Sequence, residues 1–205
     1  MTNGALVIDL DGTFYDSREI DRENKNAAIH AIAEFLKMPI KEAKLLLENA
    51  HSLRQTSTAS ILRALNIPSG LIEKYQLALI QPETHIETDN ELASLLRKLK
   101  ARFRIILLTN TRRQIAIRAL LAMNLHENDF DLILAGGDFA EPKPSVETLR
   151  NALRAVNCEP ANSYTVGDRW AVDHEPGQEL GMHAILVRGR DEFVAWLKTM
   201  QVFCN

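Results

Sequence analysis

The chain has 205 residues, of which 46% are hydrophobic and 25% charged, and its formal net charge is -3 at pH 7. This composition is that of an ordinary globular protein, and the slightly acidic balance argues against a protein built to bind nucleic acid. Its two cysteines, Cys158 and Cys204, exclude a disulfide framework or a cysteine zinc site and favour a reducing, cytoplasmic compartment, while no signal peptide or membrane-spanning segment is predicted.

The first predicted element is a buried strand in the run ALVIDLD, at residues 5–11. The following segment, residues 17–82, lacks a convincing strand and is punctuated by Pro39, Pro68 and Pro82. The helices expected within it cover residues 20–36, 40–51, 58–65 and 71–80. A helical block in this position is predicted to be a cap over the carboxyl edge of a sheet.

From residue 83 onward, short apolar runs alternate with segments of helical period. The expected strands lie in FRIILLTN, FDLILAGGD, SYTVGD and HAILVRG, and the expected helices cover residues 89–102, 111–123, 145–156 and 191–200. Such alternation implies a parallel sheet covered by helices on both faces. The sequence therefore predicts an α/β fold with a doubly wound, Rossmann-like core at residues 1–16 and 83–205, and a small all-helical cap at residues 17–82.

Polar side chains follow the apolar runs, where a structural role is not obvious. They are Asp9, Asp11, Thr109, Asn110, Lys143, Asp168 and Asp173. Because ligands bind at the carboxyl ends of the strands in an open parallel sheet, these side chains are expected to meet at one place. Crowded carboxylates suit Mg²⁺, which prefers oxygen ligands, and a lysine beside hydroxyl or amide donors suits a phosphate group.

That combination is typical of phosphoryl transfer, which depends mainly on positioning and on neutralising charge. One carboxylate could act as the nucleophile and a second as the general acid and base. Each polar residue also has a purely structural interpretation, since Asp favours turns and both Thr and Asn cap helices well.

Four motifs in this order resemble those of the haloacid dehalogenase-like superfamily. They are DLDGT from Asp9, LLTN ending at Asn110, the lysine of EPKPS at Lys143, and VGDRWAVD ending at Asp173. The helical insertion between the first two motifs is similar to the cap of the phosphoglycolate phosphatase-like and nucleotidase-like branch.

The resemblance implies a role for each matching residue. Asp9 would attack phosphorus and form an aspartyl phosphate, and Asp11 would protonate the leaving oxygen and then activate water. Thr109 and the backbone of Asn110 would hold phosphate oxygens, while Lys143 would pair with both Asp9 and the phosphate. The implied Mg²⁺ ligands are Asp9, Asp11 through its backbone carbonyl, Asp168 and Asp173.

The expected function is therefore that of a Mg²⁺-dependent phosphatase acting on a small phosphorylated metabolite, such as phosphoglycolate, a sugar phosphate or a nucleoside monophosphate. Asp11 disfavours a dehalogenase, since the family members that break carbon–halogen bonds lack an acid two residues after the nucleophile. A phosphomutase with the same residues, or a non-catalytic regulatory protein that binds phosphate or metal, stays open. The protein is expected to be a monomer or homodimer without membrane or nucleic-acid partners.

Some residues near these motifs have two interpretations. Arg169 either pairs with an acidic group of the site or points to solvent, and the second interpretation is favoured. The polar turn at residues 54–58 either caps a helix or reads the leaving group of the substrate. Tyr15 and Asp16 lie where the chain leaves the core and could help to close the cap.

Overall fold

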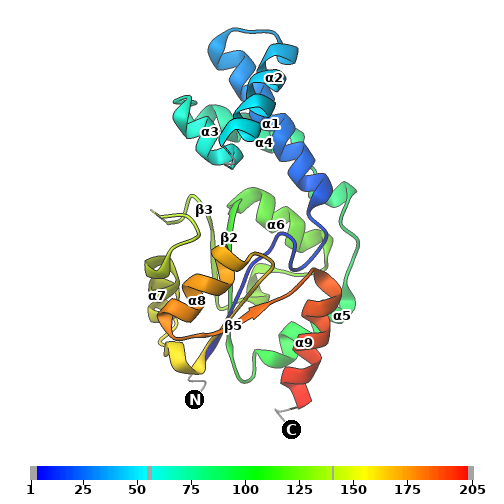
Figure 1. The fold of residues 1–205 in the computed structure, drawn as a ribbon. Helices are drawn as coiled ribbons and strands as arrows, with labels where there is room; N and C mark the ends of the chain where they lie inside the picture. The colour runs from blue at the N-terminus through cyan, green and yellow to red at the C-terminus, as the bar shows by residue number, and fades with distance from the viewer. Residues whose placement is uncertain (1–3, 55–56, 140, 203–205) are drawn as a thin grey trace. The chain divides into compact units, whose positions relative to one another are not determined.

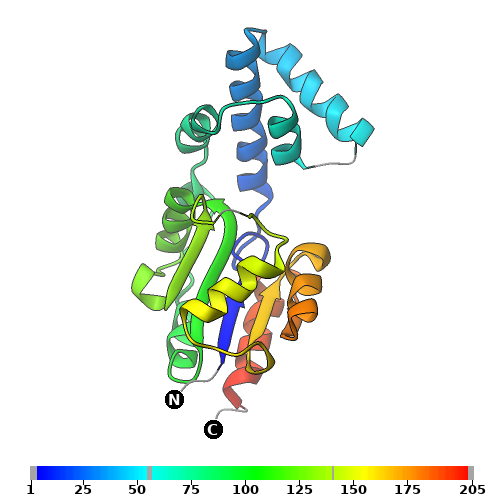
Figure 2. The ribbon, with the colours of Figure 1, turned by 90° about the vertical axis from the view of Figure 1, so that its left-hand side faces the viewer.

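The computed structural model describes residues 4–54, 57–139 and 141–202. The chain divides into two compact units, one of Met1–Ser17 with Pro82–Asn205 and the other of Arg18–Gln81. The first, which we call the core unit, contains the sheet, and the second, the helical unit, contains helices (Figures 1 and 2). None of the helices in the described ranges combines the length and the apolarity needed to pass through a membrane.

A five-stranded parallel sheet with the order β3-β2-β1-β4-β5 forms the centre of the core unit. Its strands are β1 (Ala5–Ile8), β2 (Arg104–Arg112), β3 (Leu132–Gly136), β4 (Tyr164–Gly167) and β5 (His183–Leu186). All four residues of β1 are buried, as an apolar run without alternation predicts for a strand covered on both faces. The predicted α/β fold with a doubly wound parallel sheet is confirmed.

Helices cover both faces of this sheet. They are α5 (Asn90–Leu99), α6 (Arg113–Ala122), α7 (Val146–Ala155), α8 (Glu175–Leu180) and α9 (Arg190–Val202). Helix α5 packs against α9, and α7 packs against α8, with the two pairs on opposite sides of the strands (Figures 1 and 2). Single turns complete the unit at Pro82–Thr84, Glu127–Asp129, Pro160–Asn162 and Trp170–His174, the last with π-helical geometry.

Helices α5 and α7 begin where the sequence predicts, because in each a capping side chain directly precedes a segment with one apolar face. The Asp89 side chain accepts a hydrogen bond from the backbone of Leu92 at 2.9 Å, and the Ser145 side chain accepts one from Thr148 at 3.1 Å. The helix expected at Thr111 instead begins at Arg113, because β2 continues through Arg112 to pair with β3.

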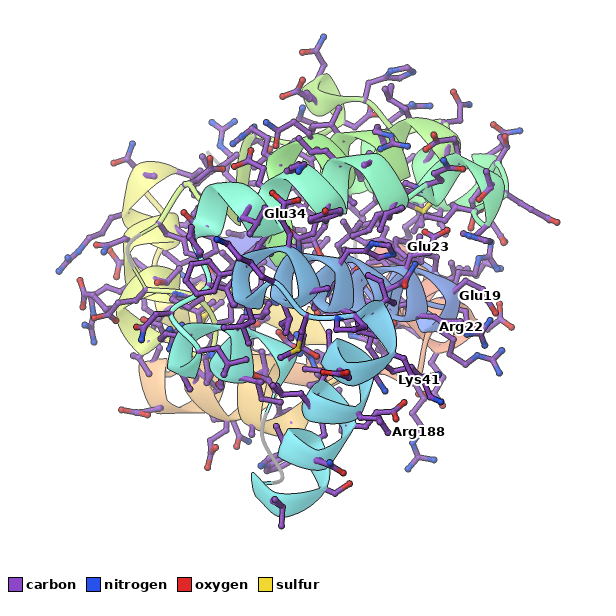
Figure 3. All side chains as sticks on the ribbon, turned by 90° about the horizontal axis from the view of Figure 1, so that it is seen from above. Glu19, Arg22, Glu23, Glu34, Lys41 and Arg188 are labelled. Carbon is purple, nitrogen blue, oxygen red and sulfur yellow. The ribbon has the colours of Figure 1, made fainter. Side chains whose placement is uncertain are left out.

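The helical unit consists of α1 (Arg18–Leu36), α2 (Ile40–Arg54), α3 (Thr58–Ala64) and α4 (Ser69–Leu79). It has an apolar core of its own, formed by Ala28, Ile29, Ala31, Ile32, Ala33, Ala43, Leu47, Ile61, Leu62 and Ile67. Glu34, labelled in Figure 3, ties α1 to α4 by accepting hydrogen bonds from Lys74 Nζ and Tyr75 Oη, each at 2.6 Å. In the turn at 54–58 the capping interpretation is confirmed at Ser57, whose side chain accepts a hydrogen bond from the Ser60 N–H at 3.2 Å. Residues 55–56 and the side chain of Arg54 lie outside the described residues, so contact of this turn with the substrate stays a prediction.

Candidate active site

Asp9 follows the central strand β1 and is only 3% exposed. Its backbone N–H donates to the carbonyl of Val166 at 2.9 Å, which ties the end of β1 to β4. The chain then turns sharply at Gly12, whose φ is +76°. A Cβ atom at Gly12 would lie 2.4 Å from Asp168 Oδ2, so only glycine permits this close approach of the turn to the aspartate.

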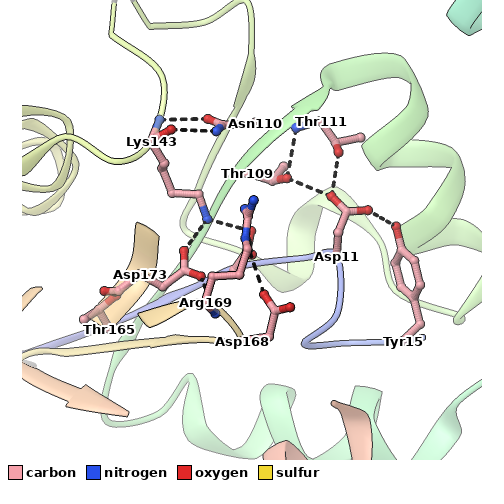
Figure 4. A network of polar contacts seen from close by, with 11 residues as sticks. Asp11, Tyr15, Thr109, Asn110, Thr111, Lys143, Thr165, Asp168, Arg169 and Asp173 are labelled. Carbon is pink, nitrogen blue, oxygen red and sulfur yellow. Dashed lines mark hydrogen bonds and ion pairs between the residues drawn. The ribbon is translucent and has the colours of Figure 1, made fainter. Parts of the chain in front are cut away.

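A buried ammonium group links two of the carboxylates. Lys143 Nζ lies 2.6 Å from Asp9 Oδ1 and 2.7 Å from Asp173 Oδ1. Figure 4 shows the contact with Asp173. Burial alone would lower the pKa of Lys143, but the two carboxylates outweigh it and hold the pKa above its ordinary value. The lysine therefore carries a positive charge at the centre of the site.

Asn110 places the lysine by holding its backbone. The Asn110 side-chain amide donates to the carbonyl of Lys143 at 2.9 Å, and the amide oxygen accepts from the Lys143 N–H at 2.8 Å (Figure 4). The sequence suggested a phosphate contact for the Asn110 backbone and missed this role of the side chain. The motif pattern carries no signal for it, because the contact depends on how two loops meet in space.

Three acidic residues form a cluster at the strand ends, which we call the acidic cluster: Asp9, Asp168 and Asp173. One carboxylate oxygen from each lies within 4.8 Å of those from the other two. Burial, followed by the charge of Asp9, raises the pKa of Asp168 to about 6. Burial also raises the pKa of Asp173; the Lys143 ammonium lowers it, but burial and the charge of Asp9 outweigh this effect.

The acidic cluster fits a divalent metal ion. Asp9 Oδ2 and Asp168 Oδ1 are buried and accept no hydrogen bond from any described residue. Such orphaned acceptors are costly unless a ligand satisfies them. A hard cation such as Mg²⁺ prefers oxygen ligands of this kind, and it would reduce the repulsion between the carboxylates.

The Asp11 carboxylate takes no part in the acidic cluster. It accepts hydrogen bonds from three hydroxyl groups, those of Tyr15, Thr109 and Thr111 (Figure 4). If Asp11 contributes to a metal site, only its backbone carbonyl is therefore suited to do so, which is the contribution that the motif resemblance implies.

Arg169 differs from the favoured prediction of a solvent-facing side chain. Its Nη2 lies 3.8 Å from Asp9 Oδ2, and its Nε lies 3.7 Å from Asp168 Oδ1. The side chain is still 51% exposed, so it reaches the acidic cluster from the solvent side. The excess of buried negative charge in the acidic cluster explains the attraction.

The structure thus brings the predicted residues Asp9, Lys143, Asp168 and Asp173 into direct contact or close proximity. Of the other three, Asn110 is joined to them by its hydrogen bonds to the Lys143 backbone, while Thr109 and Asp11 hydrogen-bond to each other. In total, side chains from the ends of β1, β2 and β4 and from the loop before α7 surround one position at the carboxyl edge of the sheet.

The chain belongs to the haloacid dehalogenase-like hydrolase family, whose model matches residues 6–187. It is therefore a hydrolase-family protein by both its fold and the order of its motifs.

Several proteins resemble it. A haloacid dehalogenase-like hydrolase domain-containing protein 3 of Mus musculus is 36% identical over 72 residues, which are 35% of this chain and 28% of the mouse protein. A glyceraldehyde 3-phosphate phosphatase of Methanothermobacter thermautotrophicus is 24% identical over 89% of this chain and 84% of its own length. A phosphatase structure from Thermococcus onnurineus has the same fold, with a TM-score of 0.65, 17% identity and 97% of each chain covered.

Proposed function

We propose that this protein is a Mg²⁺-dependent phosphatase that hydrolyses a small phosphomonoester through an aspartyl phosphate on Asp9. The observation that carries the proposal is the pairing of a buried aspartate with one buried lysine, beside two further carboxylates. A phosphatase needs a nucleophile, a fixed positive charge and a site for a divalent cation, and this arrangement offers all three.

Lys143 would hold one oxygen of Asp9, leaving Asp9 Oδ2, which accepts no hydrogen bond from the described residues, to attack phosphorus. The same ammonium would then bind an oxygen of the transferred phosphoryl group. Thr109, which is buried within β2, would donate its hydroxyl hydrogen to another phosphate oxygen. These groups are already in place in the folded protein, so little reorganisation would be needed when the substrate binds.

The Mg²⁺ ion would be held by Asp9, Asp168, Asp173 and the backbone carbonyl of Asp11. When bound, it would neutralise negative charge on the phosphoryl group and on the crowded carboxylates. Asp173 has a further function, because its Oδ1 pairs with Lys143 and its Oδ2 accepts from the Arg169 N–H at 3.2 Å. It would therefore fix the lysine as well as support the metal.

The helical unit Arg18–Gln81 would act as the cap that selects the substrate. A cap of this kind excludes water from the reaction and contacts the leaving group. The relatives support a search among small phosphorylated metabolites, since one of them is a glyceraldehyde 3-phosphate phosphatase.

The first test is hydrolysis of p-nitrophenyl phosphate by the purified protein with Mg²⁺, with a chelator, and in an Asp9→Asn variant. We expect turnover only when both Mg²⁺ and Asp9 are present, and trapping of an Asp9 adduct by beryllofluoride. Turnover that survives the Asp9→Asn change would contradict the proposal. A panel of glyceraldehyde 3-phosphate, phosphoglycolate, sugar phosphates and nucleoside monophosphates would then define the substrate, and isomerisation of a sugar phosphate on addition of a bisphosphate would instead indicate a mutase.

A further inference from the structure

Both oxygens of the Asp11 carboxylate accept hydrogen bonds from hydroxyl groups. Tyr15 Oη donates to Oδ1, and Thr111 Oγ1 donates to Oδ2 at 2.5 Å. Thr109 Oγ1 donates to the same Oδ2 at the longer distance of 3.3 Å (Figure 4). The roles proposed above use Thr109 and Asp11, but they leave the hydroxyl groups of Tyr15 and Thr111 without a function.

The two threonines face Asp11 because of the alternation of β2. Residues two apart on a strand point to the same face, so Thr109 and Thr111 approach one carboxylate oxygen while the intervening Asn110 side chain reaches the Lys143 backbone. The Thr111 N–H also donates to Thr109 Oγ1 at 3.1 Å, which orients that hydroxyl. Neighbouring residues of β2 therefore bind both the Lys143 backbone and the Asp11 carboxylate.

Tyr15 is fixed by the turn that follows β1. The chain folds back so that Tyr15 forms a β-bridge with Asp11, and the Tyr15 residue is only 7% exposed. Its neighbour Phe14 anchors the turn in the core, where the Phe14 ring meets the Phe193 and Phe130 rings edge to face at centroid distances of 5.3 and 6.5 Å. The buried packing of Phe14 and Tyr15 therefore holds the Tyr15 hydroxyl beside Asp11.

We infer that Tyr15 and Thr111 are positioning residues that fix the plane of the Asp11 carboxyl group for proton transfer. This inference rests on the proposed phosphatase function. Each carboxyl oxygen has one short hydroxyl contact, and two such contacts from different elements define the orientation of the group. When Thr109 turns its hydroxyl to a phosphate oxygen, Tyr15 and Thr111 still hold one oxygen each.

The proton balance explains why orientation matters. In the first step Asp9 forms a bond to phosphorus, the bond from phosphorus to the ester oxygen breaks, and the Asp11 carboxyl gives its proton to that oxygen, so that an alcohol leaves. In the second step Asp11 takes a proton from water as the water oxygen bonds to phosphorus. The bond from phosphorus to Asp9 then breaks, and its electron pair returns to the Asp9 carboxylate.

Leaving groups of different basicity separate this role from a structural one. An alkyl phosphate requires protonation of its leaving oxygen, whereas 2,4-dinitrophenyl phosphate releases a stable anion and needs little help from an acid. The parameter kcat/KM reports the steps up to formation of the aspartyl phosphate, so it isolates the step that uses the proton. We would measure it for both esters in Tyr15→Phe, Thr111→Val and Thr111→Ser.

We expect Tyr15→Phe and Thr111→Val to lower kcat/KM for the alkyl ester by about 10–100-fold, a part of the whole effect of a general acid. The value for the dinitrophenyl ester should change by less than about threefold, and Thr111→Ser, which keeps the hydroxyl, should behave as wild type. The matched control is Tyr75→Phe, which removes a tyrosine–carboxylate hydrogen bond within the helical unit and should leave both values unchanged. An equal loss for both esters, or no loss, would overturn the inference.

Crystal structures of the variants give a readout that does not need turnover. In Tyr15→Phe and Thr111→Val, the Asp11 carboxyl group should rotate or adopt two orientations, and an unchanged orientation in both would overturn the positioning role. If wild type hydrolyses no phosphate ester, the proposed function fails, and the crystal structures still decide whether the two hydroxyls orient Asp11. The two failures are therefore distinguishable.

Discussion

Replacing Lys143 by methionine measures how much the buried ammonium supports the core unit. Its Nζ contacts one carboxylate oxygen of Asp9 and one of Asp173, and all three side chains are at most 4% exposed. Removing one partner of a buried ion pair costs about 3–5 kcal/mol because the remaining charge is uncompensated. Since each kcal/mol lowers the Tm of a chain of this size by about 2–4 °C, we expect the Tm to fall by about 6–20 °C at neutral pH.

This loss should depend on pH and on Mg²⁺. Burial already raises the pKa of Asp173, and removing the ammonium beside it would raise that pKa further. A carboxyl group with a raised pKa in the folded state contributes stability that is present at acidic pH and lost as the pH rises through that pKa. The Tm difference between the Lys143→Met variant and wild type should therefore be small in acid and grow toward neutral pH, while added Mg²⁺ should reduce it.

Thermal and urea denaturation followed by circular dichroism would measure the effect. The control is Lys74→Met, which removes an ammonium that pairs with Glu34 at the surface of the helical unit, and which should leave the Tm unchanged. A loss below about 1 kcal/mol for Lys143→Met at neutral pH, or an equal loss at acidic and neutral pH, would refute the reasoning.

Three further changes test the metal site and the support of the lysine. Gly12→Ala places a Cβ atom 2.4 Å from Asp168 Oδ2, at a residue whose φ is +76°. We expect the Mg²⁺ affinity measured by calorimetry to fall at least about tenfold and the free energy of unfolding to fall by about 1–2 kcal/mol, and an unchanged affinity would contradict this. Because the pKa of Asp168 is raised to about 6, protons should compete with Mg²⁺ for this carboxylate, and the Mg²⁺ affinity should increase as the pH rises through that value. A Kd for Mg²⁺ that is the same in acidic and neutral conditions would refute this prediction. Asn110→Ala removes both hydrogen bonds to the backbone of Lys143 and should lower kcat about tenfold with little change in KM; a rise in KM alone would indicate a substrate contact instead.

The sheet and the elements of the core unit follow well from the sequence. Unbroken apolar runs such as residues 5–8 occur where both faces of a strand are covered, and they identify the parallel sheet without knowledge of its partners. Because functional groups gather at the carboxyl ends of such strands, the same pattern also selects Asp9, Lys143 and Asp168 as neighbours, although they lie far apart in the chain.

The strand pattern does not predict the contacts of Thr111 with Asp11 or of Arg169 with Asp9. The prediction that a helix begins at Thr111 is wrong, and it concealed the strand alternation that aims Thr109 and Thr111 at Asp11. Strand β2 instead continues for two residues beyond its predicted end, with irregular pairing to β3, so Thr111 belongs to the strand and not to the helix. Arg169 was misassigned for a related reason, since its attraction to Asp9 arises from a local excess of charge that exists only after folding.

The central place of β1 in the sheet has a consequence for biosynthesis. In the finished sheet Ala5 pairs with Arg104 and Leu6 pairs with Tyr164, so β1 leaves the ribosome well before the partners on which it depends. At synthesis rates of about 5–20 residues per second, the apolar β1 would remain unpaired for on the order of 5–20 s before β2 is complete. During this interval the helical unit, which is a single continuous segment, can already fold, while the unpaired apolar β1 is exposed to aggregation until its partners are made.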